Sequence, residues 1–460
     1  MDSLNVLVIA YYFPPMALSG VQRISKFVKY LPEFGWNPIV LTTNAPYYQF
    51  DNSLLDELIQ KNIKIYRTDE NRSKSLKNNN KQNSEEKNNE NLGEYKRNIN
   101  NNNQFTFSYP GRFRQRLQAI ILQTIFQPDS RRMWKKKALK TAETIFQEND
   151  IDLILATAPP FTDFLVAEEL SDKYNIPFIL DYRDLWVDNP YYIYTTVFHK
   201  NYAVKLENRI LTKAARTIVI TREMKNRLLQ RYRFLNHNDI TIIPHGYDQE
   251  DFDKARTFQQ NTSEIFPLNK NTKKSKFIIT HSGLFSQDLT PKYLFQAVSE
   301  LIQEKPEMKD TLEIRMVGIL QKKFIKMINK LNLQDNVKAP GYLNHIQSLQ
   351  ALLQSDVLWL MMPNGLVTPG RLFEYLGAKK PIIFSSPKSD LTQIVESTGA
   401  GIITQPNDVK ELKKAILNYY NLWKKNSLPI PNESVIEKYE RKELTRQLAK
   451  ELAYCVKLFR

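Results

Sequence analysis

The sequence predicts an α/β protein with two doubly wound parallel sheets. Short apolar runs, which are typical of strands buried on both faces, alternate with helical apolar stripes along most of the chain. This alternation indicates strand–helix–strand units, whose strands pair in parallel. At about 150 residues per domain, a chain of 460 residues is too long for one core. We therefore expect two large domains.

The first domain is expected to span residues 1–245. It opens with an apolar strand at 4–10, followed by a loop that Pro14 and Pro15 keep from being helical and by a helix from about Gly20. The further strands are expected at 37–42, 151–156, 176–181, 216–220 and 240–243, and the helices between them are expected to end near Glu148, Tyr174, Ile210 and Tyr232.

The second domain is expected to span 246–432, with a polar linker at 251–276 near its start. The last stretch, 433–460, has helical spacing and no strand after it, so we expect a C-terminal helix that packs back on the N-terminal domain. The strands are expected at 277–281, 312–317, 356–362, 381–384 and 401–404, with helices following Pro291, Gln321, His345, Arg371 and Val409.

Residues 70–104 differ in composition from the rest of the first domain. Thirteen of these thirty-five residues are Asn, and most of the others are Lys, Glu or Ser. Such a segment buries too little apolar surface to offset the entropy lost on ordering. We interpret it as a disordered surface insertion, and an interaction or condensation element is the alternative.

The overall composition is that of a globular protein, with 42% apolar and 25% charged residues. No apolar run approaches the roughly 20 residues that span a bilayer, and the N-terminus lacks the pattern of a signal peptide, so a cytoplasmic protein is expected. The single cysteine, Cys455, excludes an intramolecular disulfide and a cysteine-rich metal site. The formal net charge of +16 favours an anionic partner. Nucleic acid is not expected, because the charge is spread along the chain without an aromatic stacking platform.

The densest positive charge lies in residues 111–140, which contain nine Arg or Lys and one acidic residue, Asp129. An apolar stripe from Leu117 to Phe126 separates the basic clusters. A helix with this pattern either lies in the interface of an anionic membrane, which would make the protein peripheral at the inner membrane face, or packs on the core with a solvated basic edge.

Residues 364–381 contain a loop and a helix start directly after an apolar strand. The first turn of a helix exposes backbone N–H groups that bind anions, and a nearby glycine allows close approach. Arg371 adds donors for phosphate, and Glu374, one turn later, can accept hydrogen bonds from hydroxyls. The stretch therefore suits a nucleotide diphosphate with its ribose, and an Arg–Glu pair in solvent is the alternative.

Two further loops follow strands of the first domain, where open parallel sheets bind ligands. The first loop contains Ser19, Gly20 and Arg23. We interpret these residues as an anion contact, and for Arg23 a solvated helix residue is the alternative. The second loop contains Asp181, Arg183 and Asp184, which we interpret as a functional cluster or as a structural Asp–Arg–Asp network.

Seven stretches together carry a resemblance to a known family. They are VLVIAYYFPPMALSGVQR, PDSRRMW, TAPPF, DYRDLWVDNP, IIPHGYD, HSGLF and PGRLFEYLGAKKPII, in chain order. Each is weak alone, but in this order, on two alternating α/β halves, the chain resembles a GT-B glycosyltransferase of the family 4 type. That family has two Rossmann-like domains that face each other across a cleft, and the resemblance covers nearly the whole chain.

The resemblance implies a hexosyl- or related glycosyltransferase of surface polysaccharide or glycolipid biosynthesis. The donor would be a UDP- or GDP-sugar bound by the second domain, and the acceptor a glycan or polyprenyl-linked glycan held by the first. The anomeric configuration would be retained. No metal or other cofactor is implied, because helix N-termini and basic side chains neutralise the leaving diphosphate.

The resemblance also assigns roles to the candidate residues. Glu374 matches the glutamate that binds the ribose hydroxyls, and Arg371 stands where relatives have a basic residue. Ser19 and Gly20, with Arg23 nearby, match the acceptor-side loop at the diphosphate. Asp181, Arg183 and Asp184 are expected to orient acceptor or donor at the catalytic centre rather than to attack covalently. The full donor set expected is Glu374, Arg371, Gly370, Thr368, Gly283 and Tyr342.

Two positions depart from the family pattern. Many members have a glutamate eight positions before Glu374 that contacts the donor sugar, whereas this chain has Leu366. Leu284 follows Gly283 where a basic residue is common. We therefore expect nucleotide binding with altered sugar specificity. Two alternative functions stay open, a sugar-nucleotide epimerase of the same architecture and a non-catalytic nucleotide-sugar-binding partner subunit.

Overall fold

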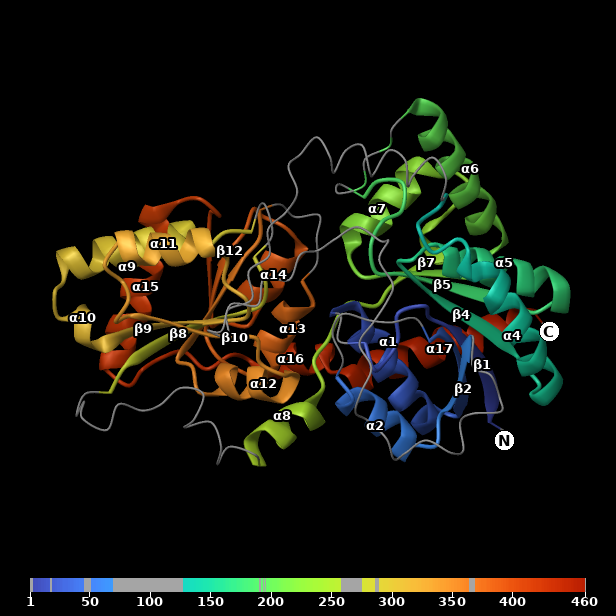
Figure 1. The fold of residues 1–460 in the computed structure, drawn as a ribbon, viewed down its shortest axis with the longest axis horizontal. Coiled ribbons are helices and arrows are strands. Elements are labelled where there is room, and N and C mark those ends of the chain that lie inside the picture. Colours follow the sequence, from blue (N-terminus) through green and yellow to red (C-terminus); the bar gives the residue numbers. More distant parts are fainter. Residues whose placement is uncertain are drawn as a thin grey trace, which may run out of the picture.

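Two parallel β-sheets flanked by helices make up the protein (Figure 1). The computed structural model describes residues 3–16, 19–44, 51–68, 127–189, 192, 194, 196–257, 275–285, 289–363 and 369–459. The predicted fold class is confirmed, because both sheets are wholly parallel where their pairing is described and both carry helices on their two faces.

The first sheet has seven strands in the order β3-β2-β1-β4-β5-β6-β7. The strand order reverses between β1 and β4, which is where such sheets bind ligands. The strands are β1 (Leu4–Ile9), β2 (Trp36–Thr43), β3 (Lys64–Thr68), β4 (Leu153–Ala158), β5 (Phe178–Tyr182), β6 (Arg216–Val219) and β7 (Ile240–Ile242). The helices are α1 (Ser19–Tyr30), α2 (Ser53–Gln60), α4 (Trp134–Glu148), α5 (Thr162–Tyr174), α6 (Val197–Lys213) and α7 (Arg222–Arg231).

The second sheet has six strands in the order β10-β9-β8-β11-β12-β13, with its reversal between β8 and β11. The strands are β8 (Phe277–Ser282), β9 (Leu312–Val317), β10 (Val337–Gly341), β11 (Val357–Met361), β12 (Ile382–Ser385) and β13 (Gly401–Thr404). The helices are α9 (Lys292–Glu304), α10 (Met308–Thr311), α11 (Lys322–Lys330), α12 (His345–Leu353), α13 (Gly370–Gly377), α14 (Asp390–Ser397) and α15 (Val409–Lys424).

Strand β1 shows why the apolar runs become strands. Its alternate side chains point to opposite faces of the sheet. Leu7 and Ile9 enter a core that α4 and α5 cover, and Val6 and Val8 enter a second core that α1 covers. All four side chains are fully buried, and each such burial contributes roughly 1.5–3 kcal/mol. A run that is apolar on both faces is therefore stable only between two helical layers.

The C-terminal segment crosses back to the first domain. Short helix α16 (Glu433–Ile436) leads to α17 (Arg441–Phe459), which packs on α1, with Leu444 and Leu448 in the same core as Ile24. Where the chain crosses, the Tyr247 N–H donates to the Tyr439 carbonyl over 3.0 Å. The two segments that join the domains therefore run side by side.

Three features of the fold differ from the sequence-based expectations. The predicted linker begins as α8 (Gln249–Thr257), because its acidic residues have buried partners in the other domain. Strands β3 and β10 were not predicted, and both lie at sheet edges.

Some sequence-based predictions concern residues outside the described part of the chain. These are the insertion at 70–104, the stripe from Leu117 to Phe126, Leu366 and Thr368. Within the described part of the chain, no helix combines the length and the apolar character needed to cross a membrane.

Candidate functional site

Helix α13 carries the residues expected at the donor. It begins at Gly370, beyond the carboxyl end of β11, so its first backbone N–H groups lie at the ligand-binding edge of the sheet. The Tyr375 hydroxyl fastens this helix to the sheet. It accepts a hydrogen bond of 2.7 Å from the Ser282 N–H and donates one of 3.4 Å to the Trp359 carbonyl. The helix start and the end of β8 are therefore held together.

Arg371 lies directly over Gly283. A Cβ atom on Gly283 would overlap the guanidinium of Arg371. The φ angle of +137° at Gly283 is also one that residues with a Cβ rarely adopt. Glycine at this strand end thus lets a cationic side chain approach the backbone. Two expected donor residues that are far apart in the sequence are in contact.

His281 orients Arg371 and was not predicted from the sequence. Its Nδ1 lies 3.1 Å from the Trp359 carbonyl, which can only accept, so Nδ1 carries the proton. Nε2 is then an acceptor, 3.4 Å from Nη1 of Arg371. Burial and the charge of Arg371 lower the pKa of His281 to about 3. The ring is therefore neutral at physiological pH and accepts from the arginine. The position of His281 at the end of β8 is the sequence feature that could have identified it as a candidate site residue.

Three other expected donor residues belong to the described part of the chain. Glu374 is one turn after Arg371, and its side chain is 21% exposed. Apart from its chain neighbours and the backbone of its own helix, Gly370 has no residue that the structure describes within 4 Å of the point where its Cβ atom would stand. Tyr342, just after β10, is 50% exposed. Burial and the charge of Asp51, a residue of the first domain, raise the pKa of Tyr342.

On the first domain, Arg23 and Asp181 form a buried ion pair. Nη2 of Arg23 lies 2.8 Å from Oδ1 of Asp181, and the two side chains are 0% and 1% exposed. The Thr157 hydroxyl donates to Oδ2 of Asp181 over 2.8 Å, and Nη1 of Arg23 donates to the Pro244 carbonyl over 2.7 Å. The structure thus places Arg23 in the interior, bound to protein, rather than at a surface open to an anion.

Arg183 lies against Gly20 as Arg371 lies against Gly283. A Cβ atom on Gly20 would overlap the Arg183 guanidinium, which also donates to the Pro159 carbonyl. Burial lowers the pKa of Arg183, and the charge of Asp181 acts against that shift. Each domain therefore pairs a glycine near its first strand with a buried or half-buried arginine from elsewhere in the chain.

The remaining candidates of the first domain have different surroundings. Ser19 opens α1 next to Gly20, and Asp184 is exposed. Asp163, which was not predicted, is fully buried and accepts the Tyr11 N–H over 2.9 Å. Burial raises the pKa of Asp163 well above its ordinary value. Its location at the start of α5, beyond the end of β4, is the sequence feature that could have identified Asp163 as a candidate site residue.

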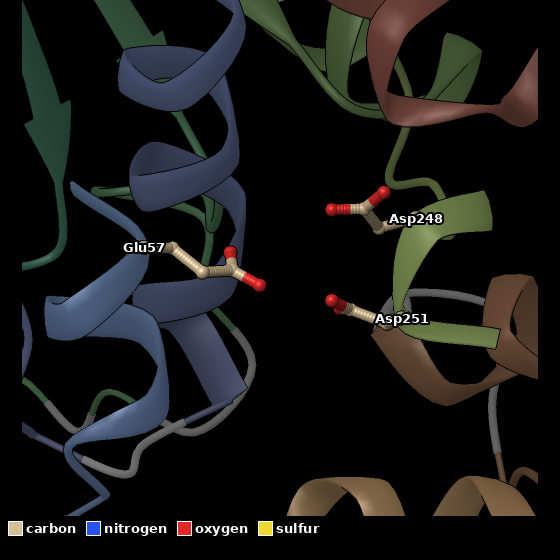
Figure 2. Close-up of side chains that lie close together, drawn as sticks. All are labelled: Glu57, Asp248 and Asp251. Atoms are coloured by element: carbon tan, nitrogen blue, oxygen red, sulfur yellow. The ribbon is translucent and has the colours of Figure 1, made fainter. Parts of the chain in front are cut away.

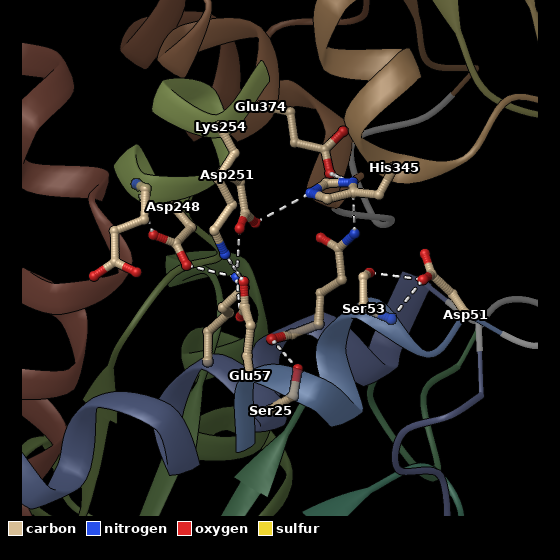
Figure 3. A network of polar contacts seen from close by, with 12 residues as sticks. Ser25, Asp51, Ser53, Glu57, Asp248, Asp251, Lys254, His345 and Glu374 are labelled. Atoms are coloured by element: carbon tan, nitrogen blue, oxygen red, sulfur yellow. Dashed lines mark hydrogen bonds and ion pairs between the residues drawn. The ribbon is translucent and has the colours of Figure 1, made fainter. Parts of the chain in front are cut away.

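A set of charged residues joins the two domains, and we call it the seam cluster. Its members are Lys26 and Lys29 on α1, Glu57 on α2, Asp248 before α8, Asp251 on α8 and His345 on α12. Figure 3 shows this network between the two domains. None of these residues was predicted to have a role, because Lys, Glu, Asp and His side chains are usually exposed to solvent.

The three carboxylates of the seam cluster also have the arrangement of a metal site. Oxygen atoms of Glu57, Asp248 and Asp251 lie within 4.8 Å of one another, and Figure 2 shows them facing each other. However, Nζ of Lys26 is 2.8 Å from Glu57, 2.6 Å from Asp248 and 2.7 Å from Asp251. The ammonium group of Lys26 occupies the position that a cation would take. We therefore interpret the cluster as an ion-pair network that holds the domains together.

Comparison with protein families gives two matches that together cover most of the chain. Residues 104–251 match the model described as Glycosyltransferase Family 4. Residues 262–433 match the model described as Glycosyl transferases group 1. No curated protein matches the sequence.

Solved structures with the same fold extend over nearly the full length. A glycosyltransferase from Rickettsia africae has a TM-score of 0.62 at 15% identity, over 99% of this chain and 100% of its own. Alr3699/HepE of Anabaena, in complex with UDP and glucose, has a TM-score of 0.60 at 15% identity, over 97% and 99%. UDP-GlcNAc 2-epimerase from Neisseria meningitidis, bound to UDP-GlcNAc, has a TM-score of 0.56 at 13% identity, over 98% and 100%. At these identities the likeness concerns the fold.

Proposed function

Because the chain belongs to the GT-B glycosyltransferases of the family 4 type, we propose that it moves a sugar from a UDP- or GDP-sugar to a glycan or polyprenyl-linked acceptor. The observation that carries this proposal is the contact of Arg371 with Gly283 at the start of α13. At this point the Arg371 guanidinium lies beside the backbone N–H groups of a helix start, and together these donors suit a diphosphate. Glu374, one turn later and partly exposed, then accepts the ribose hydroxyls.

The proposed transfer retains the anomeric configuration. The bond between the anomeric carbon and the diphosphate oxygen breaks, and the acceptor oxygen bonds to that carbon on the same face. The acceptor proton passes to the departing diphosphate, whose charge Arg371 and the helix start stabilise. Asp181 already binds Arg23 and Thr157, which supports a mechanism without a covalent intermediate on this carboxylate. No metal is needed in this mechanism, because these donors carry out its electrostatic role.

The proposed pathway is the assembly of a cell-surface polysaccharide or glycolipid. If its acceptor is linked to a lipid, the enzyme must bind at the membrane. The segment before α4 supports this proposal, because Arg131 and Arg132 are exposed next to Met133, which is 73% exposed. Such a mixture of basic and apolar groups suits an anionic interface. Arg131→Gln with Arg132→Gln should reduce flotation with anionic vesicles. The matched control is Lys322→Gln with Lys323→Gln on α11 of the other domain, where both lysines are exposed.

The function is tested by a panel of nucleotides and nucleotide sugars. UDP and UDP-glucose come first, since the similar Anabaena protein was solved with UDP and glucose; GDP and GDP-mannose follow. A ligand at 100 times its Kd stabilises the folded state by about 2.7 kcal/mol, so a binding donor raises Tm. Failure of every nucleotide to raise Tm would overturn the proposal.

Products separate the proposed function from its alternatives. A glycosyltransferase releases nucleoside diphosphate when an acceptor is added. An epimerase, the function of one structure with the same fold, converts the donor into an isomeric sugar nucleotide without an acceptor. A partner subunit binds the donor and leaves it unchanged.

A further inference from the structure

His345 lies where three other helices and both domains meet. Its Nε2 is 3.2 Å from Oδ2 of Asp251 on α8. Its Nδ1 is 3.1 Å from Nε2 of Gln22 on α1 and 3.9 Å from Oε1 of Glu374 on α13. Figure 3 shows the ring between the Asp251 and Glu374 carboxylates. The imidazole thus connects the first domain to the carboxylate expected at the donor ribose.

The local backbone holds this ring in place. His345 is the first residue of α12, and Asn344 and Gln347 form a capping box around it. The Gln347 N–H donates to Asn344 Oδ1 over 2.9 Å, and the Asn344 N–H donates to Gln347 Oε1 over 3.1 Å. A helix start capped on both sides is well ordered. The side chain is 15% exposed, so its neighbours determine its hydrogen bonds.

The hydrogen bonds of the ring depend on its protonation. A carboxylate only accepts, so Nε2 carries a proton toward Asp251. When Nδ1 is unprotonated it accepts from the Gln22 amide. When it is protonated that hydrogen bond is lost, and the imidazolium forms an ion pair with Glu374. Burial lowers the pKa of His345, but the hydrogen bond to Asp251 and the charge of Glu374 outweigh burial, and the net shift is upward. The imidazolium is therefore the form favoured between the two carboxylates.

We infer that His345 is a positioning residue for the donor. With both ring nitrogens protonated, it holds the Glu374 carboxylate in the orientation that accepts the ribose hydroxyls. Gln22 of the first domain opposes this form, because its amide N–H donates only to an unprotonated Nδ1. This inference rests on the proposed function. It adds a link between donor binding and domain arrangement, because displacement of α1 removes Gln22 from Nδ1 of His345.

The surroundings of His345 predict a pH dependence of donor binding. The charged groups that line the same small cavity are Lys26, Asp248, Asp251, Glu374 and Arg441. Burial lowers the pKa of Arg441 to about 9, and the Asp251 and Asp248 carboxylates outweigh burial to raise the pKa of Lys26. These cations keep their charge across the neutral range, whereas His345 loses its charge as the pH rises through its own raised pKa. Donor affinity should therefore fall as the pH rises through the raised pKa of His345.

A double-mutant cycle tests the inference. The affinity of UDP and GDP is measured by calorimetry for the wild type, His345→Gln, Glu374→Gln and the double variant. We expect His345→Gln to weaken nucleotide binding about tenfold in the wild-type background and about twofold or less in the Glu374→Gln background. We also expect the fall in affinity with rising pH to be absent from His345→Gln. His237→Gln, an exposed histidine of the first domain, should bind as the wild type does.

The outcomes distinguish the inference from the proposed function. Equal weakening by His345→Gln in both backgrounds, with an unchanged pH profile, would mean a purely structural role and would overturn the inference alone. A wild type that binds neither nucleotide would refute the proposed function together with the inference. If His345→Gln loses its thermal transition, Gln22→Ala replaces it. That variant must strengthen binding with Glu374 present, because loss of the Gln22 N–H leaves Nδ1 to be protonated and to pair with Glu374, and it must leave binding unchanged in Glu374→Gln.

Discussion

Arg23 on helix α1 and Asp181 at the end of β5 bind each other inside the first domain, with Nη2 and Oδ1 2.8 Å apart. Charges buried to this degree need a partner, because transfer of an isolated charge from water is very costly. The pair joins α1, which follows β1, to β5 on the other side of the strand-order reversal between β1 and β4.

Asp181→Ala should destabilise the first domain by about 3–5 kcal/mol, because it leaves the Arg23 charge buried and unpaired. The midpoint of urea unfolding, followed by tryptophan fluorescence, measures this loss. Glu143→Ala is the control, since Glu143 forms an exposed pair with Lys173, and its midpoint should not change. An unchanged midpoint for Asp181→Ala combined with lost activity would instead assign Asp181 to catalysis.

Gly283→Ala should weaken nucleotide binding by about 1.5–3 kcal/mol, the size of a charge-assisted hydrogen bond, because the new Cβ displaces the Arg371 guanidinium. Gly341→Ala is the matched control. Gly341 also has a positive φ, +89°, but within the described part of the chain no residue other than its chain neighbours has a heavy atom within 4 Å of the point where its Cβ would stand. It should lose about 1–3 kcal/mol of stability from backbone strain and keep its nucleotide affinity. Equal affinity losses in the two variants would argue against a phosphate role for Arg371.

Glu374→Ala should reduce nucleotide affinity by about 1.5–3 kcal/mol, because the ribose hydroxyls lose a charged acceptor. Calorimetry with UDP and GDP measures the change. The control is Glu396→Ala, an exposed glutamate on α14 of the same domain. If both variants bind nucleotide as the wild type does while Glu374→Ala stays folded, the donor site lies elsewhere.

His281 should make the protein less stable as the pH falls. Its pKa is about 3 in the folded protein and 6.5 as the ordinary value, so the unfolded chain binds more protons between these pH values. Stability therefore rises with pH in this window and is lost progressively below about pH 6.5. His281→Asn should show a smaller drop in the urea midpoint between pH 7 and pH 5, whereas exposed His237→Asn should keep the wild-type drop. A wild-type slope in His281→Asn would show that His281 is protonated in the folded state.

The sequence located most strands because burial on both faces requires a local run of apolar residues. Strands β9 and β13 have the predicted bounds, 312–317 and 401–404. Strand β10 was missed because its five residues include Pro340 and Gly341, which edge strands tolerate and which are typical of loops. The start of α8 was expected to be linker because its acidic residues resemble a solvated segment, whereas Asp251 is buried against Lys26.

The candidate site was predictable to the extent that it depends on strand ends and helix starts. Arg371, Glu374 and Gly283 were proposed on this basis. The structure brings Arg371 into contact with Gly283, and their role in donor binding stays a prediction. The pairing of Gly20 with Arg183 was not predictable, because the two residues come from elements far apart in the chain. The same reason applies to His345, which the sequence indicated only as a helix start.

The sequence by itself determined the α/β class, the two sheets and, through its motifs, the glycosyltransferase family. Those features are local, since residue spacing decides which faces of a strand or helix are apolar. Only the tertiary structure decided which charges are buried and which of them face each other. It placed Arg23 on Asp181, Lys26 among three carboxylates and His345 beside Glu374. The energy of a charge depends on its burial and on its nearest opposite charge, and packing of distant elements decides both.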